Sequence, residues 1–464
     1  MIIGDLKNKK VTVMGLGLHG GGIGTVRFLV AAGAKVIVTD LKSMEELAPS
    51  LEKLKDLKGV EYVLGQHRSE DFTSVDTVMM NPAVSWNNKH IKLALEKKIP
   101  VEIDSSLFFK LCKNPIVGVT GTRGKTTAAS LIYEILKVAG KNPIKVGIGQ
   151  ISVLDKLKEL KKDSIVIFEL SSWRLSALGR YKLSPKISVI TNIYPDHLNY
   201  YKSMKEYIAD KKNIFLNQKA SGVCVINYDS EILRSLEPEI KAEVIKFSMQ
   251  KISNGKTVYI DNEEVYLNNG IDDKKIMDVS AIKIRGRHNL QNILASIGAA
   301  QALGVDMNYI KKGILEFKDL PHRLEFVREL DGAKYYNDTC ATSPEGAIAG
   351  INSFTEPIIL IAGGSDKNLN MRGWAQAIHE KAKGVIFLKG EGTNKIISEL
   401  RKIFNDPEKD FTIVESMEKA VELAKNSVEK GDVVLLSPGA ASFGLFINEF
   451  DRGNKFKEAV KNLK

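Results

Sequence analysis

The sequence predicts an α/β protein of three domains, each built on a largely parallel β-sheet. The chain has 464 residues, about three times a typical domain length of roughly 150 residues. Short runs rich in valine and isoleucine alternate with helical patterns along almost the whole chain, as in repeated β-α-β units. Glycine-rich loops follow two of these runs. The predicted domains cover residues 1–110, 111–318 and 319–464.

The first predicted domain opens with a strand that leads into a glycine-rich turn. A helix follows at Thr25–Ala32 and ends at Gly33, because glycine readily takes the left-handed conformation that terminates helices. The predicted strands of this domain are Lys10–Met14, Lys35–Thr39, Val75–Met79 and Pro100–Ile103.

The second and third domains repeat this alternation. The second has a predicted helix at Thr126–Ala139 and strands at Pro115–Thr120, Ser164–Phe168, Ile187–Thr191 and Gly222–Ile226. The third has predicted strands at Lys334–Tyr336, Pro357–Ala362, Gly384–Leu388, Phe411–Val414 and Asp432–Ser437. Between Ile245 and Ile284 the pattern changes to short strands and turns, with Asn254-Gly255 and Asn269-Gly270 as hairpin signals. This stretch predicts a small β appendage on the second domain.

The composition excludes several classes of protein. Hydrophobic residues make up 44% and charged residues 27% of the chain, as in ordinary globular proteins. No apolar run reaches the ~20 residues of a membrane helix, and the N-terminus lacks the layout of a signal peptide. The cysteines Cys112, Cys224 and Cys340 are scattered, so neither a disulfide framework nor a structural zinc site fits. We expect a cytoplasmic monomer with no membrane insertion.

The net charge of +11 is compatible with a nucleic acid or an acidic small molecule as partner. The lysines are dispersed along amphipathic helices such as Leu154–Lys162 rather than massed in a tail. This distribution favours a solvated, lysine-rich surface over a nucleic-acid patch, so we expect no nucleic-acid partner.

The first glycine loop has the pattern of a dinucleotide-binding turn. Gly15, Gly17 and Gly20 match GxGxxG between a strand and a helix, and Asp40 ends the second strand. The glycines allow backbone N–H groups to approach a diphosphate, and Asp40 can accept hydrogen bonds from a ribose. The first domain is therefore predicted to be Rossmann-like. The loop alone favours a nicotinamide cofactor, although any nucleotide diphosphate meets the same requirements, and a glycine-rich turn without a ligand is the plainer alternative.

The second glycine loop is a more specific signal. Residues 116–127 read IVGVTGTRGKTT, a strand that ends in a turn whose Lys125 can reach β- and γ-phosphates. The hydroxyl of Thr126 can bind Mg²⁺, and the N-terminus of the following helix adds its dipole. The strict GxxxxGK[ST] pattern is missed by one position, because Gly118 lies six residues before Gly124. The loop is thus a P-loop variant that predicts ATP binding.

Polar residues follow other predicted strands at the same edge of the second sheet. Glu169 ends the strand SIVIF, where a carboxylate beside a P-loop can bind Mg²⁺. His197 follows the next strand end and is a candidate for a metal ligand or a substrate contact, although a lone histidine is more often structural. The helix predicted at Ser203–Phe215 carries lysines that composition alone assigns to a solvated face: Lys205, Lys211 and Lys212.

Three loops of the third domain also follow predicted strands. They span residues 337–342, 363–367 and 437–443. Parallel sheets bind ligands at the carboxyl ends of their strands. Together these loops predict a ligand-binding edge on a domain that we expect to be Rossmann-like and to face the ATP site.

Eight motifs now form a recognisable series. In order along the chain they are GTRGKTT, ELSSW, TNIYPDH, RGRHNLQNI, LPHRLEFV, NDTCATSPE, IAGGSDK and LLSPGAASFGLF. The series resembles the Mur ligase family. The short N-terminal domain and LSPGAASF favour the member that joins D-glutamate to UDP-N-acetylmuramoyl-L-alanine in peptidoglycan precursor synthesis.

The resemblance implies a division of labour among the domains. The N-terminal domain is expected to bind UDP, the central domain ATP, and the C-terminal domain the incoming amino acid. The substrate carboxylate attacks the γ-phosphate of ATP and forms an acyl phosphate. The amine of the amino acid then attacks that carbonyl, and a tetrahedral intermediate collapses to amide and phosphate. Metal and lysine offset the charge that gathers between the two anions.

The resemblance also implies roles for single residues. The expected catalytic residues are Lys125, Glu169, His197 and Lys211, with Lys211 carbamylated beside magnesium unless the register shifts to Lys212. Two magnesium ions are expected on Thr126, Glu169, His197 and Lys211. ATP is expected to contact Gly121, Thr122, Arg123, Gly124, Lys125, Thr126, Thr127, Asn289, Asn292, Arg323 and Asp338. The UDP substrate is expected on Gly15, Gly17, Leu18, His19, Gly20, Asp40, Leu41, Ala83 and His197, and the amino acid on Thr342, Lys367, Ser442 and Phe443.

Four positions depart from the family pattern. Arg123 replaces a P-loop asparagine, Gly147 replaces another asparagine, and Cys340 replaces a lysine. Glu449 stands at an aromatic position, with Phe450 one residue away. L-glutamate or another amino acid therefore stays open as the substrate. The alternatives of a different class are an NAD(P)-binding Rossmann protein with an ATPase module, and a non-catalytic nucleotide-binding module in a larger complex.

Overall fold

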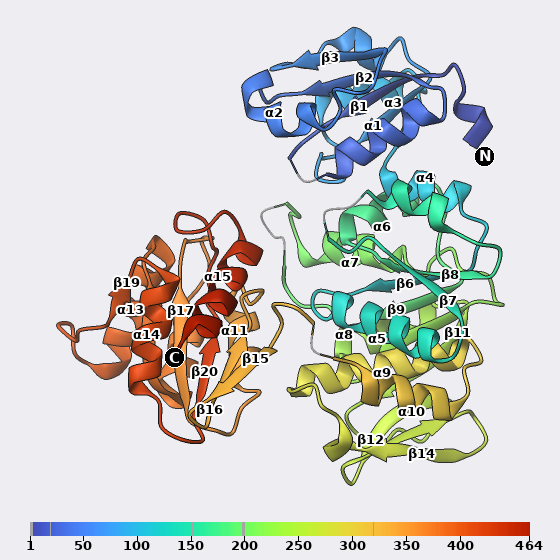
Figure 1. Cartoon of the computed structure of the whole chain (residues 1–464). Helices are drawn as coiled ribbons and strands as arrows, with labels where there is room; N and C mark the ends of the chain where they lie inside the picture. The colour runs from blue at the N-terminus through green and yellow to red at the C-terminus, as the bar shows by residue number, and fades with distance from the viewer. Residues whose placement is uncertain (1–2, 19, 150–151, 197–199, 319) are drawn as a thin grey trace. The chain divides into compact units, whose positions relative to one another are not determined.

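Three β-sheets with helices on their faces organise the part of the chain that the structure describes (Figure 1). The structure is a computed structural model, and it describes residues 3–18, 20–149, 152–196, 200–318 and 320–464. Its contacts gather into two compact units. The first unit comprises Met1–Ala281 with Gln291–Glu316, and the second comprises Ile282–Leu290 with Phe317–Lys464. The domain boundaries at residues 110/111 and 318/319 stay predictions.

The first sheet is parallel and has the strand order β3-β2-β1-β4-β5 in the described residues. Its strands are β1 (Lys10–Met14), β2 (Lys35–Asp40), β3 (Val60–Leu64), β4 (Thr77–Met80) and β5 (Val101–Glu102). The helices are α1 (Gly21–Ala31), α2 (Met44–Glu52), α3 (Lys89–Glu96) and α4 (Asp104–Leu111). The strand order reverses between β1 and β4, which is where open α/β sheets bind ligands.

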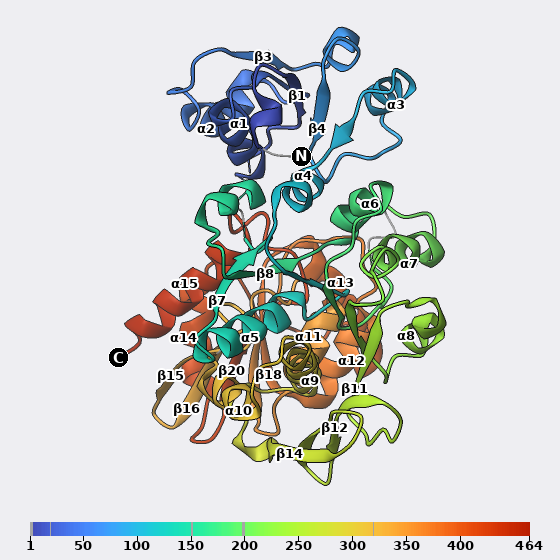
Figure 2. The same cartoon turned by 90° about the vertical axis from the view of Figure 1, so that its right-hand side faces the viewer.

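The second sheet has the order β14-β13-β12-β11-β10-β9-β6-β8-β7 within the described part of the chain. Its strands are β6 (Ile116–Thr120), β7 (Asn142–Val146), β8 (Ser164–Glu169), β9 (Ile187–Ile190), β10 (Val223–Asn227), β11 (Glu243–Ser248), β12 (Lys256–Asp261), β13 (Glu264–Asn268) and β14 (Asp273–Asp278). The helices are α5 (Lys125–Val138), α6 (Ser172–Arg180), α7 (Met204–Lys212), α8 (Glu231–Leu236), α9 (Arg287–Ala302) and α10 (Met307–Glu316). In Figure 2, α5, α9 and α10 lie together, and Ser296 of α9 donates a hydrogen bond to the carbonyl of Ala128 in α5 at 3.2 Å.

The third sheet, in the second unit, has the order β15-β16-β20-β17-β18-β19 among the residues described. Its strands are β15 (Glu325–Leu330), β16 (Ala333–Asn337), β17 (Ile358–Gly363), β18 (Ala382–Leu388), β19 (Ile413–Val414) and β20 (Val433–Leu436). The helices are α11 (Pro344–Ile351), α12 (Arg372–Lys381), α13 (Glu391–Phe404), α14 (Met417–Ser427) and α15 (Glu449–Asn462). One apolar core packs under α11, α12 and α13, and a second packs under α14 and α15. The two faces of the sheet are therefore both covered, as the strongly apolar strands require.

Several predicted elements differ from the observed ones. The first helix begins at Gly21, four residues before Thr25, because the glycine loop itself winds into the helix. The predicted amphipathic helix at Leu154–Lys162 is a 3-10 helix at Val153–Glu159. Strands β3, β7 and β15 were not predicted.

The predicted β appendage is a continuation of the second sheet. Asn269-Gly270 lies in the turn between β13 and β14, as predicted. The hairpin at Asn254-Gly255 is wrong, because these residues precede β12, which pairs parallel to β11. The hairpin between β12 and β13 turns instead at Asn262-Glu263, where both residues have positive φ angles of 49° and 59°.

None of the helices in the described ranges combines the length and the apolar character that spanning a bilayer requires.

Candidate functional site

The first glycine loop joins β1 to α1 and is fastened by Asp40. The two carboxylate oxygens of Asp40 accept the backbone N–H groups of Gly17 and Lys42, each at 3.0 Å. Gly15, Gly17 and Gly20 have φ angles of 90°, 60° and 73°, a region that favours glycine. Asp40 therefore fixes the shape of the loop. The remaining lone pairs of its carboxylate could accept hydrogen bonds from a ribose.

The neighbouring strand β4 contributes to the same edge. Asn81 donates a hydrogen bond to the carbonyl of Gly15 at 3.3 Å, and its side-chain oxygen accepts the N–H of Ala83 at 3.0 Å. A small cavity of about 40 Å³ lies beneath the loop and is lined in part by Gly15, Gly22 and Asn81. The structure thus brings Ala83 to the glycine loop, and it identifies Asn81 as a residue that the sequence analysis missed.

Two apolar residues predicted beside UDP lie at the surface. Leu18 is 45% exposed and Leu41 is 67% exposed. Exposed leucines on ligand loops are compatible with a nucleotide that covers them. His19 and His197 lie outside the described residues.

The P-loop follows β6, which pairs with β8 on one side and with β9 on the other. This pairing brings the ends of the three strands together. Thr126 Oγ1 donates a hydrogen bond to Glu169 Oε2 at 2.9 Å, and Lys125 Nζ donates to the carbonyls of Gly121 and Thr122 at 3.0 and 3.1 Å. Thr127, in the first turn of α5, is buried. Of the predicted phosphate and metal residues, Thr126 and Glu169 are thus in direct contact, next to Lys125.

The loop after β9 holds the P-loop through hydrogen bonds. The side-chain oxygen of Asn192 accepts the N–H of Arg123 at 2.8 Å, and Thr191 Oγ1 donates to the carbonyl of Arg123 at 2.6 Å. Thr122 Oγ1 accepts the N–H of Tyr194 at 2.9 Å. The backbone at Arg123 is therefore held by residues that the sequence analysis did not assign, while the Arg123 side chain is exposed.

Gly124 is the tightest point of the P-loop. Its φ angle is 82°, and an added Cβ would lie 2.1 Å from Oδ1 of Asn292 on α9. Asn292 thus lies against the P-loop. Asn289, which was predicted to act with it, belongs to the second unit, where its side chain donates to the carbonyl of Arg285 at 2.7 Å.

Lys211, in the last turn of α7, is a buried lysine of the first unit. Its side chain is 2% exposed, although composition placed it on a solvated face. Burial and the nearby charge of Lys125 hold the pKa of Lys211 well below its usual range. Nζ lies 3.5 Å from Oγ1 of Thr120, at the end of β6. Lys205 is exposed, and Lys212 forms an ion pair with Glu239.

The donor set near the P-loop fits a divalent cation in part. A hydroxyl and a carboxylate, on Thr126 and Glu169, are already in contact, and such oxygens are the ligands that Mg²⁺ prefers. A lysine amine is not such a ligand, so Lys211 fits a magnesium site only once it carries an added carboxylate. Among the described residues no three His, Cys, Asp or Glu side chains gather to hold a metal ion.

Asp338 is a buried acid of the second unit, at the end of β16. Its oxygens accept the hydroxyl of Ser437 at 3.0 Å and the N–H of Leu324 at 3.2 Å. Burial raises the pKa of Asp338 to about 7, and the nearby Arg323 opposes this rise. The predicted pair Arg323 and Asp338 is therefore brought together. Cys340 lies beside them, and burial raises its thiol pKa to about 11.

The predicted amino-acid residues lie on loops after β16, β17 and β20, the neighbouring strands at the middle of the third sheet. Lys367 Nζ donates a hydrogen bond to Thr342 Oγ1 at 3.2 Å. Ser442 is buried, and Phe443 is 62% exposed, with its carbonyl accepting the hydroxyl of Ser365. The edge thus presents the amine of Lys367, hydroxyls and an exposed ring.

Of the remaining departures, Gly147 has a structural role. A Cβ on Gly147 would lie 2.5 Å from the carbonyl oxygen of Glu169, so the backbone conformation here requires glycine. The carbonyl of Glu449 accepts the hydroxyl of Thr339 at 2.9 Å, and the ring of Phe450 packs edge-on against His322. Neither side chain replaces the missing lysine near Cys340.

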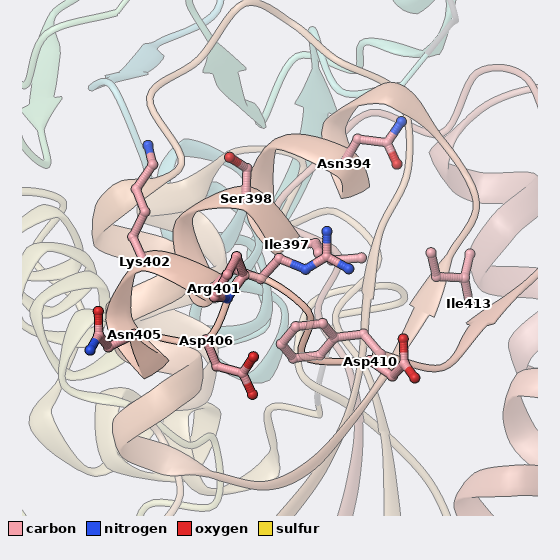
Figure 3. Close-up of a pocket in the computed structure, with 11 residues that line it drawn as sticks. Asn394, Ile397, Ser398, Arg401, Lys402, Asn405, Asp406, Asp410 and Ile413 are labelled. Atoms are coloured by element: carbon pink, nitrogen blue, oxygen red, sulfur yellow. The ribbon is translucent and has the colours of Figure 1, made fainter.

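A separate groove of about 730 Å³ runs along α13 towards β19 (Figure 3). Its lining residues, between 394 and 413, include none of the predicted site residues. Arg401 and Lys402 face it together with Asp406 and Asp410. Charges of both signs leave the groove without a clear electrostatic preference for one ligand class.

Comparison with known proteins gives the same family along the whole chain. Residues 9–102 match the Mur ligase MurD-like N-terminal domain, residues 119–300 the Mur ligase middle domain, and residues 322–439 the Mur ligase glutamate ligase domain. UDP-N-acetylmuramoylalanine--D-glutamate ligases of Roseiflexus sp. (strain RS-1) and Clostridioides difficile (strain 630) are each 39% identical. Each alignment covers 99% of this chain and 100% of the relative.

Solved structures of similar fold support the same architecture. A MurC from Thermotoga maritima covers 98% of this chain, which covers all of that protein, with a TM-score of 0.61 at 21% identity. A MurF from Thermotoga maritima, solved in complex with ADP, matches with a TM-score of 0.59 at 17% identity over 99% of this chain and 96% of its own. The predicted α/β fold of three domains is confirmed.

Proposed function

Because the chain belongs to the Mur ligase family, we propose that it is an ATP-dependent, ADP-forming ligase that adds D-glutamate to UDP-N-acetylmuramoyl-L-alanine. One observation carries the proposal: the P-loop, the Glu169 carboxylate and the buried amine of Lys211 meet at the carboxyl end of β6. The names of the relatives at 39% identity support the choice of substrates.

The reaction has to convert a carboxylate, which is a poor acyl donor, into an activated acyl group. The substrate carboxylate attacks the γ-phosphorus of ATP, the bond to ADP breaks, and an acyl phosphate forms. The amine of glutamate then adds to the carbonyl carbon, and the tetrahedral intermediate expels inorganic phosphate and leaves the amide. Both steps bring anions together, so positive groups near the reacting atoms lower the barrier.

The residues of this chain fit these demands. Lys125 and the N–H groups at the start of α5 hold the phosphates of ATP. Thr126 and Glu169 would hold Mg²⁺, which when bound offsets charge on the phosphates. Lys211, carbamylated, would add an oxygen ligand. The uncharged form of its amine attacks the carbon of CO₂, one C–O π bond opens, and an N–H proton passes to solvent water, which leaves the carbamate anion.

The second unit is assigned the amino acid. Lys367 would meet the side-chain carboxylate of glutamate, and its hydrogen bond to Thr342 supports this assignment. Arg323 and Asp338 are assigned to ATP. The glycine loop after β1 is assigned to UDP, with Gly15, Gly17, Gly20 and Asp40 around the diphosphate. We further propose that the protein acts as a monomer in the cytoplasm.

A turnover assay tests the proposal. ADP release should require ATP, Mg²⁺, UDP-N-acetylmuramoyl-L-alanine and D-glutamate together, and Lys125→Ala should abolish it. The runner-up, addition of L-glutamate or another amino acid, would appear in the same assay as a different preference within an amino-acid panel. ADP release that is indifferent to both acceptor and amino acid would refute a ligase.

A matched pair of lysine variants tests the amino-acid site. Lys367→Met should raise the KM for D-glutamate about tenfold or more, because a charged hydrogen bond contributes roughly 1.5–3 kcal/mol. Lys395→Met is the control, since Lys395 pairs with Asp366 beside the same loop. Strong activity with neutral or basic amino acids, and none with either glutamate, would contradict the role given to Lys367.

A further inference from the structure

Arg452 is fully buried in the first turn of α15, against the loops that follow the central strands of the third sheet. Its exposed fraction is 0%. The helix approaches these loops closely, because a Cβ on the next residue, Gly453, would lie 2.5 Å from Cγ2 of Thr339. The guanidinium is thus inserted under the loops and kept away from solvent.

The guanidinium joins two of the loops directly. Nε donates to Oγ1 of Thr339 at 2.9 Å, and Nη2 donates to the carbonyl of Thr339 at 3.0 Å. Nη1 donates to the carbonyls of Ala440 and Ala441, both at 3.2 Å. One side chain therefore ties the loop after β16 to the loop after β20.

The loop after β17 is coupled to the same centre. Ser365 and Ala441 exchange backbone hydrogen bonds of 3.0 and 3.1 Å, and a Cβ on Gly364 would lie 3.4 Å from Nη1 of Arg452. These three loops carry Thr342, Lys367 and Ser442. The groups assigned to the amino acid thus share one buried anchor.

Burying a charged guanidinium costs free energy of desolvation. Its acceptors are neutral carbonyls and a hydroxyl, and within the described part of the chain Arg452 makes no ion pair. Burial lowers the pKa of Arg452 to about 10, with Glu449 opposing this, so it stays charged near neutral pH. An apolar side chain would fill the same space at lower desolvation cost. Only arginine supplies a rigid, planar set of hydrogen-bond donors that reaches both loops.

We propose that Arg452 is a positioning residue for the amino-acid substrate: its guanidinium holds the three loops in the arrangement that receives the carboxylates of glutamate. The identity of the substrate rests on the proposed function, whereas the positioning of the loops does not.

The test compares two arginine-to-lysine variants. Arg452→Lys keeps the positive charge but loses the planar set of hydrogen-bond donors. Arg328→Lys is the matched control, because Arg328 Nη1 donates to the carbonyls of Val460 and Lys461 at the other end of α15, at 3.2 and 3.1 Å. For each variant we would measure KM and kcat, the thermal midpoint, and amide hydrogen exchange in peptides covering residues 363–367 and 438–443.

Arg452→Lys should raise the KM for D-glutamate about tenfold or more while the KM for the UDP substrate stays within about twofold. Exchange in both loops should accelerate, since the hydrogen bonds between Ser365 and Ala441 lose their support. Arg328→Lys should alter neither quantity, even where it lowers the thermal midpoint.

Two outcomes would overturn the proposal. One is an unchanged KM for D-glutamate together with unchanged exchange in both loops. The other is a parallel rise of every KM that tracks the loss of thermal stability and is matched by Arg328→Lys, which would mark a purely structural role. If the wild type uses neither glutamate, the proposed function fails, and exchange in the two loops still decides whether Arg452 positions them.

Discussion

Lys211 has two properties that favour a reaction with carbon dioxide, a lowered pKa and a side chain that is almost fully buried. Its pKa is held well below the usual range by burial and by Lys125. Lys211→Ala should therefore lose most activity, and a short carboxylic acid should partly restore it by replacing the carbamate oxygens. The measurement is the rate of ADP release with and without the added acid.

The neighbouring lysine provides the control for this experiment. Lys212 is paired with Glu239, so Lys212→Ala should keep most activity and show no rescue. The wild type should lose activity as the pH falls through the lowered pKa of Lys211, because the protonated amine cannot form a carbamate. Loss of activity in Lys211→Ala without any rescue would favour a structural role for this lysine.

Asp338 makes the stability of the second unit depend on pH. Burial raises its pKa to about 7, above the value in an unfolded chain, so the native state binds the proton more tightly. The resulting stabilisation is fully present below the unfolded pKa and is lost as the pH rises through about 7. Asp338→Asn should remove this dependence.

The pH dependence is measured by denaturing the wild type and Asp338→Asn at pH 5 and pH 8. Unfolding is followed through the signal of Trp374. The free energy of unfolding of the wild type, relative to Asp338→Asn, should fall by on the order of 2 kcal/mol between these pH values. Trp86 and Trp173 would be replaced by phenylalanine in both proteins. A difference that is constant with pH would refute the assignment of the titration to Asp338.

The start of α5 requires glycine for two reasons, its backbone angle and the close approach of α9. Gly124→Ala should weaken ATP binding about tenfold or more, because the left-handed backbone costs roughly 1–2 kcal/mol and the methyl group would displace Asn292. The Kd for ATP, measured by titration, reports this effect.

Gly140, just beyond the other end of the same helix, is the matched control. Its φ angle is 68°, and an added Cβ would meet nothing within 4 Å. Gly140→Ala should thus cost stability through backbone strain and leave the Kd for ATP unchanged. Equal effects of the two substitutions on ATP binding would show that strain in α5 alone is responsible.

The protein should distinguish UDP from a nicotinamide cofactor through the effect of each ligand on its thermal stability. A ligand present at about 100 times its Kd stabilises the native state by roughly 2.7 kcal/mol. UDP should therefore raise the thermal midpoint of the first unit, and NAD⁺ at the same concentration should not. The opposite result would favour an NAD(P)-binding protein with an ATPase module.

A pair of acidic residues completes this comparison. Asp40→Asn should weaken the response to UDP, because Asp40 holds the N–H of Gly17 in the glycine loop. Asp56→Asn, at an exposed ion pair with Arg27 in the same domain, should keep the response. A response that survives in both variants would remove Asp40 from the UDP site.

The sequence by itself determined the fold class and the place of the two glycine loops. The predicted strand Lys10–Met14 has the same ends in the structure, and the P-loop follows β6 as expected. These features are readable because they depend on local patterns: alternation of apolar runs, glycine at left-handed positions, and polar residues after strands. Parallel pairing then brings strand ends together, so the sequence pattern is sufficient to predict that Glu169 lies near Thr126.

Tertiary structure alone decided which side chains are buried and what they touch. Composition treats Lys211 and Lys212 alike, yet packing buries the first beside Thr120 and leaves the second paired with Glu239. Arg452 lies in a charged helix that shows no local sign of an anchor, and its partners are more than ten residues away in sequence. Burial and long-range hydrogen bonds depend on which helices and strands pack against one another. A local sequence pattern does not specify that packing, so these properties could not be predicted from it.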